Sequence, residues 1–457
     1  MRRLTGSRLV SLAVSACAMV SACSSSSSTV TSPAPSAGDA SGVLTLGPAV
    51  TAIAATTTTF TDPRSTAPPV PPATDSTTIG QTLPGASDPA ASIPVAGTTP
   101  VSRTTTSSRT TPATTTATAA TSAAALACIA KLPVQFKAGQ LVWPSVQGEE
   151  LVKQTPIFAS WGVGGAVVMT YPASANGEQL LAFKNAGQVP LLLATDEEGG
   201  NVQRFKRVGA LPIPAAVPGT MTPDQIEQAV AAHAKVIKAL GIDVVYGPIA
   251  DVSPLTGAGP IGNRAFSSDP NLVAAYDAAY VKGWESAGIL PVIKHFPGHG
   301  SASADSHKAT ATTPSLDQLE ARDLLPYSAL VDSGAGVMVG HLTVPGLTDS
   351  DGVPASLSHA AISVLLRGTY GYKDSLVFTD ALGMQAVAIK FKVPVAAEMA
   401  IEAGADVAIF TSTADAPIVI AQIVAAERTG RLTAARLDDA VSHVLRTKHI
   451  DPCTLKL

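Results

Sequence analysis

The sequence predicts a (β/α)₈ barrel over residues 128–457, and two observations carry this prediction. First, eight short apolar runs are separated mostly by amphipathic stretches, and the runs themselves do not alternate between apolar and polar residues. Such runs are typical of parallel strands that are buried on both faces. Second, in at least five of the runs the ionisable residues stand at the C-terminal end, the end at which barrels of this kind build their sites. These residues are Asp196 and Glu197, Asp251, Lys294 and His295, His341, and Asp380. A doubly wound open sheet is the main alternative.

The N-terminus has the pattern of an export signal. Arg2, Arg3 and Arg8 precede the apolar core LVSLAVSACAMVSA, which at about 14 residues is shorter than the roughly 20 that a membrane-spanning helix needs. The core runs into VSAC and five serines, which resembles a bacterial lipobox. We therefore expect residues 1–22 to be a lipoprotein signal peptide and Cys23 to carry the lipid. A plain secretory signal is the alternative.

Residues 23–127 are predicted to be a disordered tether. The segment is rich in Ser, Thr, Pro and Ala, and carries only seven charged residues between Ser24 and Leu126. It has too few large apolar side chains for their burial to offset the entropy lost on ordering. The expected protein is therefore exported and held by a lipid anchor on the extracytoplasmic side of the membrane.

Charge and cysteine content limit the partners and the compartment. The net charge of −4 argues against nucleic acid or an anionic membrane surface as a partner. Cys128 and Cys453 stand at the two ends of the predicted domain. Because a closed barrel brings its ends together, these cysteines are expected to pair in an oxidising compartment; two separate buried thiols are the alternative. A monomer without cofactor is expected.

The candidate strands and helices follow one another along the domain. Two helical segments carry a capping-box pattern: TPDQIEQAVAAHAKVIKALG with Thr222 and Gln225, and SLDQLEARDLLPYSALVDSG with Ser315 and Gln318. In chain order the candidate strands are QLVWPSV, GAVVMT, PLLLATDEEGG, IDVVYGPIADVSP, LPVIKHFPGHG, AGVMVGHLTVPG, SLVFTDALGM and ADVAIF.

The stretch KHFPGHGSASADSH holds three of the eight histidines. His295 and His299 are four residues apart, but a Pro-Gly turn does not place them on one helical face, so no metal site is expected. The stretch lacks the glycine spacing of a phosphate loop, and Ser301 is not in the G-x-S-x-G elbow of a serine hydrolase. His299 is given no chemical role beyond shaping the turn.

We interpret the stretch as two parts instead. Lys294 and His295 end a strand and are expected to be fixed hydrogen-bond donors in a pocket. Asp305 and His307 lie beyond a run of small residues that is typical of a mobile loop. A carboxylate two residues from an imidazole can hold its tautomer, which suits a general acid/base. A solvated loop with a local Asp–His hydrogen bond is the alternative.

Further charged residues stand at the same predicted rim. Asp380 ends an apolar strand, where an unpartnered carboxylate is costly, and Asp196 ends another, shortly before Arg204. Arg264 lies in a predicted turn. Acids, cations and histidines in one pocket suit carbohydrate binding, with charged groups that bond sugar hydroxyls and a carboxylate that attacks the anomeric carbon.

Four motifs occur in order along the domain: DEEGGNVQRF, GNRAF, KHFPGHG followed by DSH, and TDALGM. Together they resemble glycoside hydrolase family three, in its single-domain β-N-acetylglucosaminidase branch of bacterial cell-wall recycling. The resemblance covers about Gln135 to Arg446. It implies a barrel that removes non-reducing terminal N-acetylglucosamine (GlcNAc) from peptidoglycan fragments, with retention and through a covalent glycosyl-enzyme.

The resemblance also implies roles for individual residues. Asp380 would be the nucleophile, and His307 with Asp305 the acid/base pair. Five residues would bind the terminal sugar: Asp196, Arg204, Arg264, Lys294 and His295.

The chain departs from relatives at two motif positions. Ala381 stands where relatives often have an acid, and Asn201 where they often have a basic residue. The alternatives are a β-glucosidase or another exo-glycosidase, because no residue identified here recognises the N-acetyl group, and a sugar-binding lipoprotein without turnover.

Overall fold

The computed structural model describes residues 123–457 apart from 172–176, 254–258 and 350–351. The predicted signal peptide, the predicted lipidation site Cys23 and the predicted tether up to residue 122 lie outside the described residues. Among those described, no helix has both the length and the apolar character needed to cross a bilayer.

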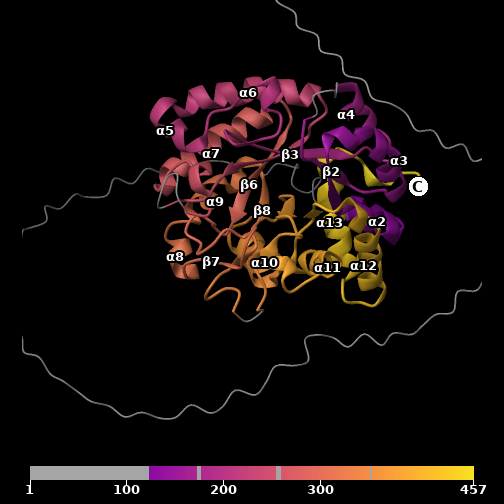
Figure 1. The fold of residues 1–457 in the computed structure, drawn as a ribbon. Helices are drawn as coiled ribbons and strands as arrows, with labels where there is room; N and C mark the ends of the chain where they lie inside the picture. The colour runs from indigo at the N-terminus through magenta and orange to yellow at the C-terminus, as the bar shows by residue number, and fades with distance from the viewer. Residues whose placement is uncertain (1–122, 172–176, 254–258, 350–351) are drawn as a thin grey trace, which may run out of the picture. The chain divides into compact units, whose positions relative to one another are not determined.

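Eight parallel strands form a nearly closed barrel surrounded by helices (Figure 1). Each of the eight predicted runs contains one of these strands, which confirms the barrel over the open sheet. A short strand, β4 (Val202–Gln203), pairs antiparallel with β3. Around the barrel the strands are β10 (Val377–Thr379), β8 (Gly336–Val339), β6 (Leu290–Phe296), β5 (Val244–Ile249), β3 (Leu192–Gly199), β2 (Gly165–Val168), β1 (Val142–Val146) and β11 (Ala408–Phe410).

The barrel closes between β10 and the residue that precedes β11. Phe378 and Val407 form a parallel bridge, and the Thr379 amide donates to the Val407 carbonyl over 3.0 Å. The Val407 amide donates in turn to the carbonyl of Val377 over 3.1 Å.

A buried carboxylate reinforces this closure. Asp406 has no exposed surface and accepts hydrogen bonds of 2.7 Å from both Arg367 and Arg436. Burial alone would raise the pKa of Asp406, but the charges of these guanidinium groups and of His443 lower it. Asp439 also lies within reach of Asp406 and His443, but both oxygens of Asp406 are taken by the arginines. We therefore interpret the cluster as an ion-pair network.

The two predicted capping boxes are present, but one predicted helix is interrupted. Thr222 caps α6 (Pro223–Ala239) as expected. The stretch predicted as a second helix instead forms α8 (Leu316–Glu320) and α9 (Leu325–Leu330). Pro326 explains the break, because proline has no amide hydrogen and its ring collides with the carbonyl four residues earlier in a continuous helix.

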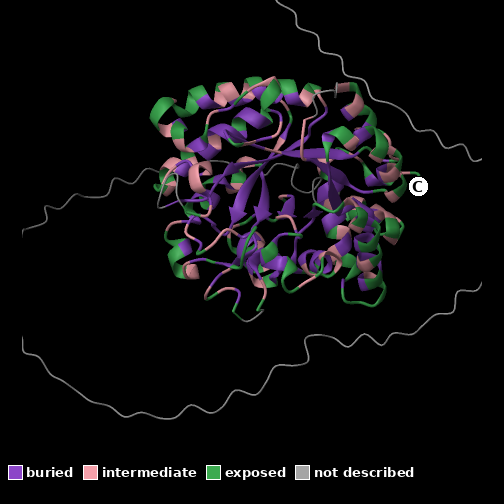
Figure 2. Ribbon diagram, in the orientation of Figure 1, coloured by how far each residue is buried: buried purple, intermediate pink, exposed green. Residues whose placement is uncertain are grey.

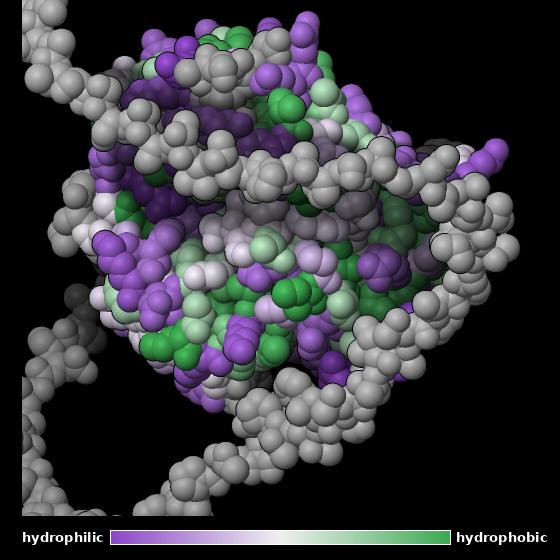
Figure 3. Space-filling view, turned by 45° about the vertical axis from the view of Figure 1, so that its right-hand side comes forward, coloured by the Kyte–Doolittle hydropathy of each residue, from purple (hydrophilic) through white to green (hydrophobic). Residues whose placement is uncertain are grey.

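The remaining helices pack outside the strands, and Figure 2 shows buried strands at the centre with exposed residues on the outer helix faces. The surface drawn in Figure 3 mixes hydrophilic and hydrophobic residues. Further helices are α2 (Val134–Gln140), α3 (Leu151–Trp161), α4 (Gly177–Lys184), α5 (Val217–Thr220), α7 (Pro270–Glu285), the π-helix η8 (Ala360–Thr369), α10 (Gln385–Ala388), α11 (Val393–Ala403), α12 (Ala416–Arg428) and α13 (Ala434–Thr447).

Aromatic side chains fill the barrel interior. The ring of Phe378 contacts Trp143 of β1 and Tyr246 of β5, with centroid distances of 5.3 and 5.5 Å. Neither β1 nor β5 is a direct neighbour of β10, so Phe378 points inward. Side chains alternate along a strand, and Asp380, two residues on, therefore points inward as well.

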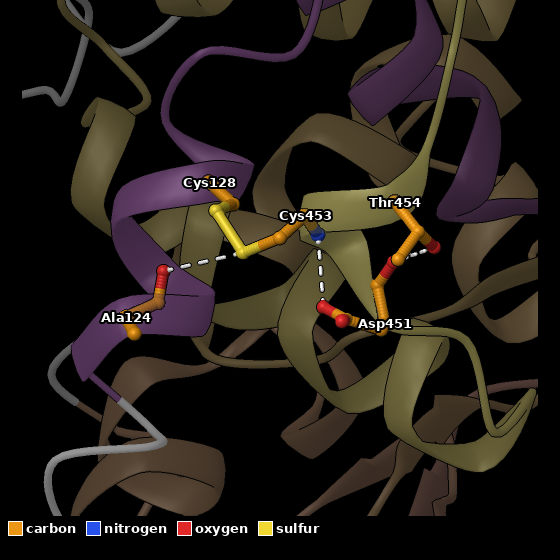
Figure 4. Close-up of a disulfide and its surroundings, with 5 residues drawn as sticks. All are labelled: Ala124, Cys128, Asp451, Cys453 and Thr454. Atoms are coloured by element: carbon orange, nitrogen blue, oxygen red, sulfur yellow. Dashed lines mark hydrogen bonds between the residues drawn. A yellow bond between two sulfur atoms is a disulfide. The ribbon is translucent and has the colours of Figure 1, made fainter.

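A disulfide joins the N-terminal and C-terminal segments of the barrel domain. Cys128, on a helix over residues 123–129, is bonded to Cys453 in the short helix η10 (Pro452–Thr454) (Figure 4). The two residues are 325 positions apart, so the bond restricts the unfolded chain over nearly the whole domain.

Reduction of this disulfide is expected to lower the free energy of unfolding by about 2–4 kcal/mol, because cross-links act mainly by restricting the unfolded ensemble. Denaturant unfolding with and without a thiol reductant measures the change. A Cys128→Ser/Cys453→Ser variant is the control and should not respond to the reductant. Equal midpoints for oxidised and reduced wild-type protein would contradict the prediction.

Candidate active site

Two carboxylates at the C-terminal end of β3 point into the barrel rim. Asp196 and Glu198 are two residues apart and so lie on one face of the strand. Glu197, between them, faces the other way, with its Oε2 2.8 Å from Nε2 of His233 on α6. The sequence indicated Asp196 and Glu197 as strand-end acids and missed Glu198. The two-residue period of the DEE triplet is the signal that could have found it.

Three cations hold these two acids in place. Lys294, on β6 and 3% exposed, lies 3.0 Å from Oδ1 of Asp196 and 2.6 Å from Oε1 of Glu198. Arg204 donates to Asp196 over 3.0 Å, and Arg264 binds Glu198 through two bonds of 2.7 Å. Four of the predicted site residues, with Glu198 as their common partner or neighbour, thus meet in one cluster.

Electrostatics keep this cluster ionised. Burial would raise the pKa of Asp196, but the charges of Lys294 and Arg204 hold it below its usual range. For Glu198 the opposing charges are Lys294 and Arg264, and its pKa is also lowered. Two anions and three cations therefore form a rigid array of acceptors and donors, which is suited to binding the hydroxyl groups of a sugar.

Asp251, which follows β5, fixes His295. Asp251 has no exposed surface, and its Oδ2 lies 2.7 Å from Nδ1 of His295. Burial raises the pKa of Asp251, but the charge and hydrogen bond of His295 lower it to about 2. The carboxylate therefore accepts a hydrogen bond from the Nδ1–H group of His295 and sets the orientation of the ring. The sequence placed Asp251 at the rim without a role.

Asp380 follows β10 and is held as an anion. Its Oδ1 accepts a 2.7 Å hydrogen bond from the Ala381 amide. Burial would raise its pKa, but the charges of His341, His295 and Lys294, together with that amide, lower it. The Ala381 carbonyl also accepts from Nε2 of His341 over 2.9 Å. Ala381 therefore links Asp380 to His341 through its backbone amide and carbonyl, and its side chain takes no part.

The predicted acid/base pair lies on the loop between β6 and the short strand β7 (Ala311–Thr312). Nδ1 of His307 is 2.9 Å from Oδ1 of Asp305, which also accepts from the His307 amide over 3.0 Å. Burial raises the pKa of Asp305, but these bonds and one from Lys308 together lower it to about 2. The His307 side chain is 62% exposed and that of Asp305 is 30% exposed, so the pair lies at the protein surface. Asn201 is also exposed.

A separate cavity of about 830 Å³ lies at the opposite end of the barrel. Its lining includes Leu192 and Leu290, the first residues of β3 and β6. The candidate catalytic groups lie at the carboxyl ends of the strands, where barrel enzymes carry out their chemistry. We therefore locate the active site at the carboxyl end.

A buried anionic carboxylate and an array of paired charges at the carboxyl end of a (β/α)₈ barrel are typical of carbohydrate-cleaving enzymes, the glycoside hydrolases. The chain belongs to glycosyl hydrolase family 3. Residues 134–447 match the sequence profile described as "Glycosyl hydrolase family 3 N terminal domain", which confirms the resemblance seen in the motifs.

Named relatives and solved structures agree with this assignment. The chain is 42% identical over 273 residues to "Beta-hexosaminidase LpqI" of Mycobacterium tuberculosis, covering 58% of this chain and 70% of the relative. It is 36% identical to a "Beta-hexosaminidase" of Stenotrophomonas maltophilia over 57% of this chain and 80% of that protein.

Solved structures share the fold. The structure of "M tuberculosis LpqI" matches with a TM-score of 0.66 at 37% identity, over 71% of this chain and 96% of that one. A family 3 β-N-acetylglucosaminidase from Paenibacillus matches with a TM-score of 0.65 at 30% identity, over 70% of this chain and 62% of that one.

Proposed function

We propose that the chain is a retaining exo-β-N-acetylglucosaminidase that releases non-reducing terminal GlcNAc from peptidoglycan-derived fragments of the GlcNAc–MurNAc type. The observation that carries the proposal is the pairing of an anionic, inward-facing Asp380 with a separate acid/base pair on a loop. The names of the relatives, beta-hexosaminidase and β-N-acetylglucosaminidase, support GlcNAc as the sugar that is released.

In the first step, Asp380 attacks the anomeric carbon of the terminal sugar and forms a covalent ester, while the bond to the leaving oxygen breaks. His307, as imidazolium, gives its Nε2 proton to that oxygen. Asp305 keeps the Nδ1 proton in place, since its carboxylate accepts the hydrogen bond from Nδ1.

In the second step, water attacks the same carbon and displaces the Asp380 carboxylate. The now neutral His307 takes a proton from the water at Nε2 and is restored as imidazolium. Two displacements at one carbon return the original β configuration.

The charged cluster would bind the terminal sugar. The carboxylate of Asp196 would accept hydrogen bonds from sugar hydroxyl groups. Lys294, Arg204 and Arg264 would donate hydrogen bonds to those hydroxyl groups, and His295 would lie beside these residues. Because these groups are already paired with one another or with neighbouring acids, they need little reorganisation when substrate arrives. This preorganisation favours a sugar held in one orientation.

A histidine acid/base suits an anionic leaving group. Most glycoside hydrolases use two carboxylates, and a second carboxylate at the mouth would repel the lactyl carboxylate of a muramic acid. The imidazole of His307 carries no negative charge in either protonation state, and Lys308 beside it is 82% exposed and cationic. These features support a peptidoglycan fragment as substrate.

The proposed location is the outer side of the membrane, held by lipid on Cys23. The basic residues, apolar core and VSAC pattern of the N-terminus support it. A disulfide between Cys128 and Cys453 agrees with an oxidising compartment.

Kinetic comparison of 4-nitrophenyl N-acetyl-β-glucosaminide with 4-nitrophenyl β-glucoside tests the proposed activity. We expect kcat/KM to favour the acetamido sugar by at least about 100-fold, as in sites that bond a substrate polar group. GlcNAc should also be released from a GlcNAc–MurNAc disaccharide. Preference for the glucoside would instead indicate a β-glucosidase, and binding without turnover of either would indicate a sugar-binding lipoprotein.

A further inference from the structure

His299 is the histidine of the KHFPGHG motif that the proposed chemistry does not use. It lies in the turn that follows β6 and is 3% exposed. Its amide donates a 2.6 Å hydrogen bond to Oδ1 of Asp251, the carboxylate that also orients His295. His299 and the proposed sugar-binding residue His295 are therefore both held by the carboxylate of Asp251.

The ring of His299 reaches the acid/base loop. Its Nε2 lies 2.9 Å from Oγ of Ser306, the residue between Asp305 and His307. Ser306 is 1% exposed, whereas the side chains of Asp305 and His307 are 30% and 62% exposed. Only the middle residue of the triplet is buried, and its hydroxyl contacts His299.

A second hydrogen bond ties Ser306 to the helix that follows Asp380, the proposed nucleophile. The Ser306 carbonyl accepts a 3.2 Å hydrogen bond from the amide of Ala386. Ala386 lies in α10, the first helix after Asp380. Ser306 is therefore held from one side by the motif turn and from the other by the segment that follows the nucleophile.

The neutral form of His299 fits this contact. Burial and the charge of His295 lower the pKa of His299. Its Nδ1 is buried without a hydrogen-bond partner among the described residues. A proton on Nε2 avoids an unpaired buried N–H, so Nε2 donates to the Ser306 hydroxyl.

We propose that His299 and Ser306 form a latch that sets the position of the acid/base pair relative to Asp380. Both are positioning residues, since neither is placed to touch the reacting atoms. The latch rests on the proposed roles of His307 and Asp305. If the loop moves by an ångström, proton transfer becomes slow even though both catalytic side chains are intact.

Ser306→Ala tests the latch, because it removes only the hydroxyl. We expect kcat/KM to fall about tenfold for phenyl N-acetyl-β-glucosaminide, a poor leaving group that needs the proton, and less than about twofold for the 2,4-dinitrophenyl substrate. Ser303→Ala is the matched control, since Ser303 is an exposed serine of the same loop that bonds the Thr312 amide. The control should show no change in leaving-group dependence.

His299→Asn and the double variant complete a thermodynamic cycle. If the two side chains act only through each other, the double variant loses no more activity on the phenyl substrate than the worse single variant. Trypsin gives a readout without catalysis, because the loop carries Lys308, which is 82% exposed. Cleavage after Lys308 should be several-fold faster in Ser306→Ala than in wild-type protein.

Equal losses in Ser306→Ala for good and poor leaving groups, or additive losses in the cycle, would overturn the latch. The wild-type enzyme separates this outcome from failure of the proposed function. If wild-type protein does not hydrolyse aryl N-acetylglucosaminides, the proposed function fails. If it does and Ser306→Ala behaves like wild type, the latch alone fails.

Discussion

Replacement of Asp380 by alanine is expected to lower kcat by at least about 10³-fold, which is about 4 kcal/mol of activation free energy. The variant has no atom that can form the glycosyl ester. The neighbouring positive charges that now lower the Asp380 pKa remain, so binding of the terminal sugar should change only a few-fold. Steady-state kinetics on 4-nitrophenyl N-acetyl-β-glucosaminide and calorimetric titration with GlcNAc measure the two quantities.

Asp224→Ala is the matched control, because Asp224 is an exposed aspartate in the first turn of α6. Its activity should stay within about twofold of wild type. A fluorinated glycosyl donor that accumulates as the covalent ester identifies the nucleophile directly by peptide mass spectrometry. An adduct on any residue other than Asp380 would overturn the assignment.

Replacement of His307 by alanine is expected to cost about 10²- to 10⁴-fold on phenyl N-acetyl-β-glucosaminide, the range typical of a lost general acid. The 2,4-dinitrophenyl substrate leaves without a proton, so formation of its glycosyl-enzyme should be nearly unaffected. Because His307 is 62% exposed, its loss should not destabilise the fold. Pre-steady-state kinetics on both substrates separate the two steps.

Azide supplies an independent check on the His307 role. An azide ion is already a nucleophile and needs no general base, so it should attack the glycosyl-enzyme of His307→Ala and yield a β-glycosyl azide.

Asp305→Asn should show a smaller loss of activity on the phenyl substrate than His307→Ala, since Asp305 acts through His307. Equal losses on good and poor leaving groups would remove His307 from the acid role.

The strands and the positions of the rim residues could be predicted because they depend on local patterns. Apolar runs with charged ends mark buried parallel strands, and each predicted run contains a strand of the barrel. The groups expected at the rim, among them Asp196, Lys294 and Asp380, all lie at strand ends. Their chemical roles stay predictions until the variants are measured.

The features that could not be predicted from the sequence depend on contacts between distant segments or on the path of a loop. Glu198 is defined by its partners Lys294 and Arg264, which lie 96 and 66 residues further along the chain. His299 had no role because its partner Ser306 lies in a loop whose path is not encoded by local periodicity. The capping box at Ser315 predicts a single helix, but Pro326 interrupts it and two short helices form.

The disulfide has a mechanical consequence. The segment ahead of residue 123 joins the barrel through the helix that carries Cys128, and Cys128 is bonded to Cys453 at the far end of the chain. Tension along that segment is therefore shared between both ends of the domain. The pull is not borne by β1 alone, so the first strand is not peeled from its neighbours β2 and β11. If the protein is held by the proposed lipid anchor, the disulfide would distribute a pull on that anchor between both ends of the domain.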